Sequence, residues 1–283
     1  MARNNRIKAE GEAYYHVIAR VANGAYLLRD AKRKRRLLDI LYCAAEFSGV
    51  DVCTYAVMDN HLHLCVRVPE RKASGDGEVL RRFGALYGDR QKRSFERRLS
   101  ELRKGGRFVD AEGELDRLKR RMGDLSEFMK TFKQRVSQWF NGELGHEGTL
   151  WSGRFKSVLV EEGAYLRVMV RYIHHNPVRA GMVRRVSDYE WSALGAAAQG
   201  DARALKGLSL LGITLETAEN GPSIRDRRLS NGVVVGSRRF VMRMGGWFAG
   251  ASQSPERRVL AFRHGGTDLF STHGQRSAPL RAA

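Results

Sequence analysis

The sequence predicts an α+β fold: an antiparallel sheet of the ferredoxin-like kind with helices on one face, plus a basic helical insertion and a C-terminal accessory region. Two observations lead to this fold class. A strand pattern, an amphipathic helix pattern and a two-strand hairpin pattern follow one another at the start of the chain, which is the first half of a ferredoxin-like unit. A second amphipathic helix and a further strand follow later, after a stretch dense in charge.

The elements of the first half follow from local patterns. Residues 13–21, "AYYHVIARV", have the β-branched and aromatic content of a strand. Asp30 can then cap a helix through "AKRKRRLLDILYCAAEFSG", in which leucines recur at helical spacing and Gly49 ends the helix. The segments "VDVCTYAV" and "HLHLCVRV" predict two strands joined by the tight turn "MDN".

The second half begins with residues 71–123, which are dense in charge and glycine with scattered helical segments, so we expect an inserted, surface-lying basic excursion. Residues 125–140 have apolar side chains at helical spacing and predict an amphipathic helix. The segment "GTLWSGRFKSVLV" leads into a short strand ending near Val160, and "AYLRVMVRYIHHN" predicts a helix that Pro177 terminates.

Residues 1–198 are expected to form one catalytic domain that contains the insertion, and residues 199–283 an accessory region. The residue pattern of the sequence changes at about Ala198, and a polar tail from about His264 predicts a disordered end. The sequence has no internal repeat.

The composition, 283 residues with 42% hydrophobic and 9% aromatic, is typical of a soluble globular protein. No apolar run is long enough to cross a bilayer, and the N-terminus lacks the apolar stretch of a secretory signal. We therefore expect a cytoplasmic, nucleoid-associated protein. Cys43, Cys53 and Cys65 lack a paired metal-ligand spacing and are expected to be reduced, mostly buried thiols.

The charge balance is the strongest global signal. Fifty Lys and Arg against 31 Asp and Glu give a formal charge of +19, and such an excess favours polyphosphate through counterion release. Nucleic acid is the expected partner. A basic protein without such a partner, or one that touches anionic membrane, is the alternative, although no basic amphipathic anchor stands out.

The stretch "MDNHLHLCVRV" holds His61 and His63 on one strand. Side chains alternate along a strand, so both imidazoles point to the same face, about 7 Å apart at the Cα level. Leu62 and Leu64 then point to the core. Two imidazoles so placed can converge on one metal ion, whereas an arbitrary His-x-His is more often a pair of hydrogen-bonded or solvent-facing histidines.

The later helix supplies the context. Tyr172 and Asn176 are four residues apart and lie on one helical face, which presents a phenol together with a neutral oxygen ligand. Two imidazoles and one amide oxygen would leave a divalent cation with its full charge and open positions, which suits polarisation of a phosphodiester. His174 and His175 lie on neighbouring faces and are expected to contribute packing or phosphate contacts.

Three blocks carry a family resemblance: "YAVMDNHLHLCVRV", "LWSGRFKSVLVE" and "VRYIHHNPVRAGMV" followed by "DYEWSALG". In this order, with the opening "YYHVIARV", the chain resembles the single-tyrosine HUH transposases, and above all the REP-associated tyrosine transposases. The resemblance covers most of residues 1–198. Asp59 departs from the family, where a proline commonly stands, and the excursion over residues 71–123 is longer than in small members.

The resemblance implies an HUH nuclease fold with His61 and His63 as metal ligands and Tyr172 as the nucleophile. Asn176 falls on the position of a third, polar ligand in related enzymes. A bound Mg²⁺ or Mn²⁺ would polarise the scissile phosphate, attack by Tyr172 would give a 5′-phosphotyrosine and a free 3′-hydroxyl, and a second 3′-hydroxyl could reverse the step. The implied substrate is single-stranded or hairpin DNA.

The expected DNA contacts are Arg154, Lys156, Trp151 and Arg179. Trp151 and Phe155 can equally be core residues, and the run "RDAKRKRR" can grip phosphates or form a solvated face. The oligomeric state stays open between monomer and dimer.

Three other functions remain as alternatives. A rolling-circle initiator or relaxase shares the histidine pair and the tyrosine, although the Asn-Pro-Val-x-Ala-Gly block favours a transposase. A domesticated DNA-binding regulator would have lost cleavage, but here the candidate ligands and nucleophile are all present. RNA binding is compatible with the charge.

Overall fold

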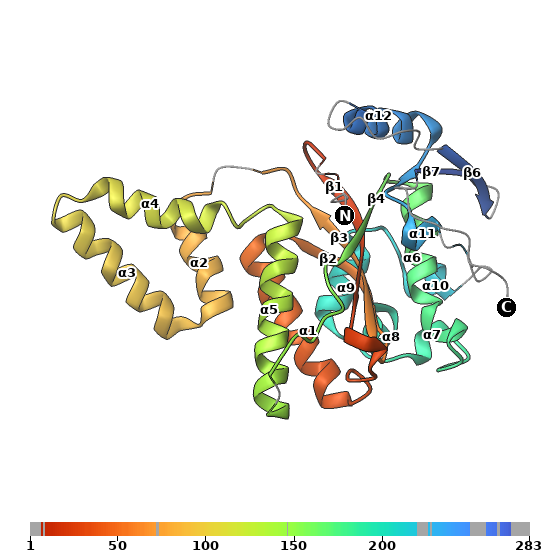
Figure 1. Ribbon diagram of the computed structural model, residues 1–283, viewed down its shortest axis with the longest axis horizontal. Helices are drawn as coiled ribbons and strands as arrows, with labels where there is room; N and C mark the ends of the chain where they lie inside the picture. Colours follow the sequence, from red (N-terminus) through yellow and green to blue (C-terminus); the bar gives the residue numbers. More distant parts are fainter. Residues whose placement is uncertain are drawn as a thin grey trace.

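The computed structural model describes residues 7, 9–71, 74–145, 147–219, 226, 228–249, 259–264 and 267–272. Within these residues the strands form one seven-stranded sheet in the order β2-β3-β1-β4-β5-β7-β6. Figure 1 shows this sheet nearly edge-on in the middle of the molecule, with helices on both sides of it. The α+β class predicted from the sequence is confirmed.

The first four strands form an antiparallel sheet with β1 and β3 in the centre, the order of a ferredoxin-like unit. They are β1 (Ala13–Arg20), β2 (Asp51–Val57), β3 (His61–Val68) and β4 (Lys156–Val160). Two long helices, α1 (Ala31–Ser48) and α5 (Leu125–Leu144), cover one face. The core on this face includes Leu62, Leu64 and Phe132, all fully buried.

The predicted limits of α1 are confirmed by its caps. The Asp30 carboxylate accepts a hydrogen bond from the backbone N–H of Arg33, which satisfies a donor that the first helical turn leaves free. Gly49 ends the helix in the left-handed region with φ 62°.

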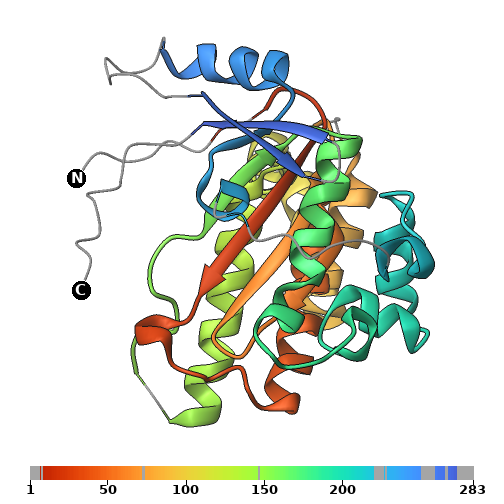
Figure 2. The ribbon, with the colours of Figure 1, turned by 90° about the vertical axis from the view of Figure 1, so that its right-hand side faces the viewer.

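The second face of the sheet is also covered, so the expectation of helices on one face was incomplete. Helix α6 (Ala164–His174) lies across this face, in front of β1 and β3 in the view of Figure 2. The reason lies in β1, where the neighbouring Tyr14 and Tyr15 point to opposite faces and are 5% and 4% exposed. A strand with apolar residues at both alternations needs cover on both sides.

Residues beyond 198 continue the same sheet. Strand β5 (Val234–Gly236) pairs in parallel with β4, and β7 (Thr267–Thr272) and β6 (Val259–His264) follow in antiparallel register. β7 falls within the polar tail that the sequence predicted to be disordered, and residues 265–266 and 273–283 of that tail lie outside the described residues.

Shorter helices surround this sheet. Helix α9 (Ala202–Ser209) packs so closely on β2 that a Cβ at Gly207 would lie 2.5 Å from the carbonyl oxygen of Val52. The others are η1 (Ala22–Gly24), α7 (Asn176–Arg179), η2 (Val186–Asp188), α8 (Ala193–Ala198), α10 (Leu215–Glu219), α11 (Arg228–Asn231) and α12 (Arg238–Ala249).

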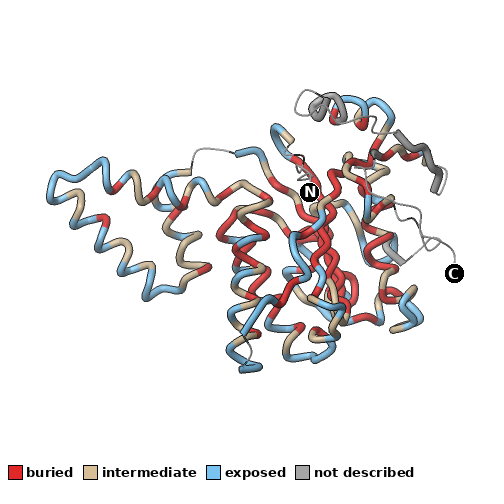
Figure 3. The backbone as a smooth tube through the Cα atoms, in the orientation of Figure 1, coloured by how far each residue is buried: buried red, intermediate tan, exposed pale blue. Residues whose placement is uncertain are grey.

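The insertion is a helical lobe that projects from the α1 side of the sheet (Figure 1). It consists of α2 (Asp76–Tyr87), α3 (Asp89–Lys104) and α4 (Phe108–Lys119). The lobe has a small core of its own, with Val79, Leu99 and Leu115 packed around Phe47 of α1. Burial is dense along the central strands and sparse along the lobe (Figure 3).

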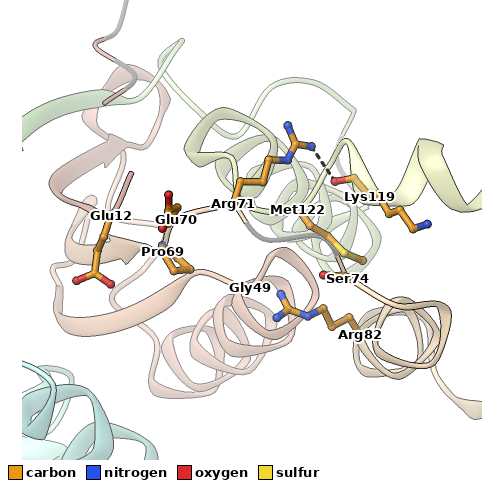
Figure 4. A pocket seen from close by; sticks show the side chains of 10 residues that line it. Glu12, Gly49, Pro69, Glu70, Arg71, Ser74, Arg82, Lys119 and Met122 are labelled. Carbon is orange, nitrogen blue, oxygen red and sulfur yellow. Dashed lines mark hydrogen bonds between the residues drawn. The ribbon is translucent and has the colours of Figure 1, made fainter. Parts of the chain in front are cut away.

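A cavity of about 700 Å³ lies where the lobe joins the main body (Figure 4). Arg71, Arg82 and Lys119 line it together with Glu12 and Glu70. Glu12 precedes β1 and Glu70 follows β3, so the cavity lies at the opposite end of β3 from its first residues.

No helix of the described part of the chain is long and apolar enough to cross a membrane. Of the three cysteines, Cys53 and Cys65 are buried and Cys43 is exposed.

Candidate active site

His61 and His63 lie on the face of β3 that α6 covers, with their ring centroids 5.0 Å apart and their planes at 76°. The predicted alternation is confirmed, because Leu62 and Leu64 belong to the core on the opposite face. His63 is 2% exposed, whereas His61, at the start of the strand, keeps partial contact with solvent. The His61 ring therefore lies nearer the solvent, and the His63 ring lies deeper in the protein.

Tyr172 comes to this cluster from α6. Its ring centroid lies 6.0 Å from that of His63, with the planes at 84°. The Tyr172 side chain is 9% exposed and belongs to the core between α6 and the sheet. Two residues predicted as ligands and the residue predicted as nucleophile are thus brought together from positions more than 100 residues apart.

His16 on β1 is a third histidine of this cluster, which the sequence analysis missed. Its Nε2 lies 2.9 Å from Nδ1 of His63, and its Nδ1 lies 2.8 Å from the carbonyl oxygen of Leu229. Its ring centroid lies 5.8 Å from that of Tyr172. The only sequence signal was its place in a predicted strand, because facing His63 requires the β1–β3 register, in which Ile18 stands opposite His63.

Burial keeps these imidazoles neutral. Burial, with a smaller effect of Arg20, lowers the pKa of His61 to about 4. Burial lowers the pKa of His16 to about 4, opposed by its hydrogen bond to Leu229. For His63, burial and then the neighbouring histidines and arginines hold the pKa well below the ordinary value. A neutral imidazole is the form that can bind a metal ion.

Asn176 lies four residues beyond Tyr172, at the start of α7. Its Nδ2 donates to the carbonyl oxygens of Tyr172, at 2.9 Å, and of Ile173, at 3.2 Å. Both amide hydrogens are thereby used at the end of α6, and Oδ1 remains as an acceptor. In the described part of the chain Asn176 makes no hydrogen bond to His61 or His63.

Arg179 lies against the candidate nucleophile. Its guanidinium is 4.6 Å from the ring centroid of Tyr172 and donates to the Tyr172 carbonyl oxygen at 3.0 Å. A cation over an aromatic face is attracted by the ring quadrupole. The structure therefore gives Arg179 a place in holding Tyr172, in addition to the DNA contact predicted for it.

The remaining predicted DNA contacts lie on and before β4. Trp151 is 5% exposed and donates from Nε1 to the carbonyl oxygen of Lys133, and Phe155 is 8% exposed. Both belong to the core, as the alternative interpretation expected. A buried indole has no free face on which to stack a base, which removes the reason for placing Trp151 among the contacts. Arg154 and Lys156 are exposed.

His174 and His175 are structural in this arrangement. His174 is fully buried, with Nε2 at 2.6 Å from Oγ1 of Thr54. His175 donates from Nδ1 to the carbonyl oxygen of Arg171 at 3.0 Å. Burial lowers the pKa of His174 to about 3, so it packs as a neutral side chain.

The described residues contain no group of three or more His, Cys, Asp or Glu side chains placed to hold a metal ion. The histidine cluster has two imidazoles with free ring nitrogens, so a cation there needs ligands of other kinds, such as an amide or a phosphate oxygen.

Comparisons with known proteins show a distant structural similarity and no match in sequence. No family model matches it, and no curated protein matches it. Among solved structures it is similar to that of a REP-associated tyrosine transposase bound to a REP hairpin. The similarity covers 80% of this chain and 94% of that chain, with 15% sequence identity and a TM-score of 0.49. A likeness this distant assigns no chemistry, which has to come from the side chains.

The turn that presents His61 is held by a buried cation. Lys34 of α1 is 3% exposed, and its Nζ donates to Oδ1 of Asp59 at 2.8 Å and to the hydroxyl of Tyr189 at 2.9 Å. The Tyr189 hydroxyl donates to the carbonyl oxygen of Val57 at the end of β2. Lys34 belongs to the run "RDAKRKRR", but it is a structural residue rather than a phosphate contact. Asp59, in the turn between β2 and β3, is its partner.

We predict that Lys34→Met lowers the free energy of unfolding by about 1.5–3 kcal/mol, because it leaves a partly buried carboxylate without its main charged donor. Urea denaturation measures this loss. The matched control is Lys32→Met on the same helix, whose side chain is 76% exposed and pairs with Glu143; its cost should stay below about 1 kcal/mol. Equal costs for the two variants would contradict the network.

Proposed function

We propose that the protein cleaves and rejoins single-stranded or hairpin DNA by metal-assisted attack of Tyr172 on a phosphodiester. His61 and His63, with Asn176, are the proposed ligands of a Mg²⁺ or Mn²⁺ ion. The observation that carries the proposal is the meeting of two neutral imidazoles of β3 with the phenol of α6 on one face of the sheet. A binding protein has no need for this combination.

The donor atoms fit a hard divalent cation with open positions. Asn60 donates from Nδ2 to the carbonyl oxygen of Gly24, so its Oδ1 accepts the hydrogen bond from Nδ1 of His61 at 2.7 Å. The Nε2 of His61 is then the nitrogen with a lone pair. An outer hydrogen bond of this kind is what orients metal-binding histidines. Asn176, with both amide hydrogens used, has only its oxygen to offer.

The bound cation would withdraw electron density from the scissile phosphate and offset charge on its oxygens. The bond changes take place at the hydroxyl of Tyr172. The Tyr172 hydroxyl oxygen forms a bond to phosphorus and loses its proton, while the bond from phosphorus to the 3′-oxygen breaks and that oxygen takes up a proton. The products are a 5′-phosphotyrosine on Tyr172 and a free 3′-hydroxyl. Arg179 beside the ring offsets negative charge that develops on the phenol oxygen.

Rejoining needs no external energy, because the phosphotyrosine keeps the energy of the broken ester. A 3′-hydroxyl of the same or another strand attacks the phosphotyrosine and releases Tyr172. The net charge of +19 supports a polyphosphate substrate. Arg154, just before β4, and Lys156, its first residue, are the proposed phosphate contacts, since both are exposed cations. Lys156 also donates from Nζ to Oδ1 of Asn231.

A rolling-circle initiator or relaxase would use the same three side chains, so the geometry does not distinguish that alternative from a transposase. A non-cleaving regulator would bind hairpins without a covalent product, and this difference is testable.

We predict that Tyr172→Phe abolishes formation of a covalent protein–DNA adduct on single-stranded hairpin oligonucleotides with Mn²⁺, while hairpin binding and stability stay close to wild type. The variant removes one oxygen and keeps the packing of the ring. Denaturing gel electrophoresis detects the adduct, and peptide mapping locates it.

The matched control is Tyr165→Phe, which changes a half-buried tyrosine about 10 Å earlier on the same helix. It should form the adduct at the wild-type level. An adduct on the peptide that contains Tyr165, or an undiminished adduct in Tyr172→Phe, would show that the nucleophile is misassigned. No adduct from the wild type with either metal would favour the non-cleaving regulator.

For the metal ligands we expect His61→Ala and His63→Ala each to abolish metal-dependent cleavage and to weaken Mn²⁺ binding, because either change removes one of two imidazole ligands. Isothermal titration with Mn²⁺ and a cleavage assay measure the two effects, and circular dichroism with hairpin binding checks that the fold is kept. Cleavage at the wild-type level in both variants would rule out this metal site.

A further inference from the structure

His16 is the one histidine of the cluster to which the proposed mechanism gives no part. It is fully buried, and both of its ring nitrogens are engaged: Nδ1 at 2.8 Å from the carbonyl oxygen of Leu229 and Nε2 at 2.9 Å from Nδ1 of His63. The ring planes of His16 and His63 are within 15° of each other. His16 thus connects α11 with β3, and the location of its ring proton determines which atoms donate in the two hydrogen bonds.

The positions of the protons follow from the chemistry of the acceptors. A carbonyl oxygen only accepts, so Nδ1 of His16 carries a proton and donates to Leu229. A doubly protonated His16 would be a charge buried without a counter-ion in contact among the described residues, which is costly. His16 therefore has a bare Nε2, which accepts a hydrogen bond. Nδ1 of His63 is then the donor, and Nε2 of His63 keeps the lone pair.

We propose that His16 is a positioning residue: its Nδ1 donates to the Leu229 carbonyl oxygen and its Nε2 accepts from Nδ1 of His63, which fixes His63 in the tautomer whose Nε2 can bind the metal ion. Its role toward the metal rests on the function proposed above. Without a fixed tautomer, a neutral histidine would place its proton on Nε2 for part of the time, and that form cannot bind a cation with Nε2.

The contacts of Leu229 and its neighbours hold the Leu229 carbonyl oxygen, the final acceptor of this relay, in place. Its side chain is fully buried, and its residue lies in the four-residue helix α11, where the last carbonyl oxygens have no donor within the helix. Asp226 caps α11 by accepting from the backbone N–H of Arg228 at 2.8 Å. Asn231 accepts from Nζ of Lys156 of β4 at 3.1 Å.

The relay ties the region after residue 198 to the candidate active site. The segment that was expected to be accessory supplies the carbonyl oxygen that sets the tautomer of a metal ligand on β3. The seating of α11 against β1 and β4 thereby becomes a condition for full metal affinity.

The test uses the full-length, metal-free protein labelled with ¹⁵N-histidine. Nitrogen shifts and two-bond couplings give the tautomer of each ring, and a coupling across the hydrogen bond joins Nε2 of His16 to Nδ1 of His63. We expect both rings protonated at Nδ1 and a coupling between them. A wild-type His63 protonated at Nε2 overturns the proposal, and this result needs no variant to fold and no DNA substrate.

Two variants separate positioning from packing. His16→Phe fills the space without an acceptor, so His63 should shift toward the Nε2–H form and Mn²⁺ affinity should fall by about 10- to 100-fold. His16→Gln offers a carbonyl oxygen to Nδ1 of His63, so it should restore much of the tautomer and of the affinity. A purely structural role predicts the reverse order, because phenylalanine suits a buried apolar site better than glutamine.

Tyr14→Phe is the control on the same face of the same strand, and it should leave the His63 tautomer unchanged. Unchanged His63 signals in His16→Phe would overturn the proposal. The outcome is independent of the cleavage reaction: an intact relay in a protein that forms no DNA adduct would refute the proposed function alone, and a normal adduct with His63 in the other tautomer would refute the relay alone.

Discussion

The pairing of β1 with β3 is the interaction on which the candidate site depends. Its antiparallel register sets Ile18 opposite His63 and Arg20 opposite His61. Because side chains alternate in register across the two strands, His16 shares the face of His61 and His63. A slip of β3 by one residue would turn His61 and His63 away from the face of His16 and would take Leu62 and Leu64 out of the core. The core beneath the sheet, with Leu62 and Leu64 fully buried, opposes such a slip.

The same register requires a cover over the histidine face. Tyr14, Cys65 and Val158 make that face apolar around the imidazoles, and α6 packs on it. Burial under α6 keeps the rings neutral, and the same helix brings in Tyr172. One packing event therefore accounts for the form of the candidate ligands and for the position of the candidate nucleophile.

The sequence was sufficient for those parts of the structure that depend on local pattern. The first strands, α1 with its Asp30 cap and the common face of His61 and His63 follow from short-range periodicity and capping, and all were predicted. Tyr172 was predicted as the nucleophile because the motif around it resembles that of a known family, and the structure places its ring next to His63.

What could not be predicted depends on contacts between distant segments. His16 belongs to the site only through the β1–β3 register, and Leu229 reaches it from more than 200 residues away. In the sequence Lys34 is one of several cations in a basic run, and only the folded structure brings Asp59 and Tyr189 within hydrogen-bond distance of it. Trp151 could be a stacking platform or a core residue by composition alone, and packing against α5 decided for the core.

The central claim is that His61, His63 and Tyr172 form one metal-assisted site on the α6 face of the sheet. Anomalous X-ray diffraction from crystals of the full-length protein with Mn²⁺ and hairpin DNA tests it most directly. The account predicts an anomalous peak bonded to Nε2 of both histidines, with a DNA phosphate between the metal ion and the Tyr172 hydroxyl. A peak located away from β3, or a Tyr172 hydroxyl turned away from the phosphate, would contradict it.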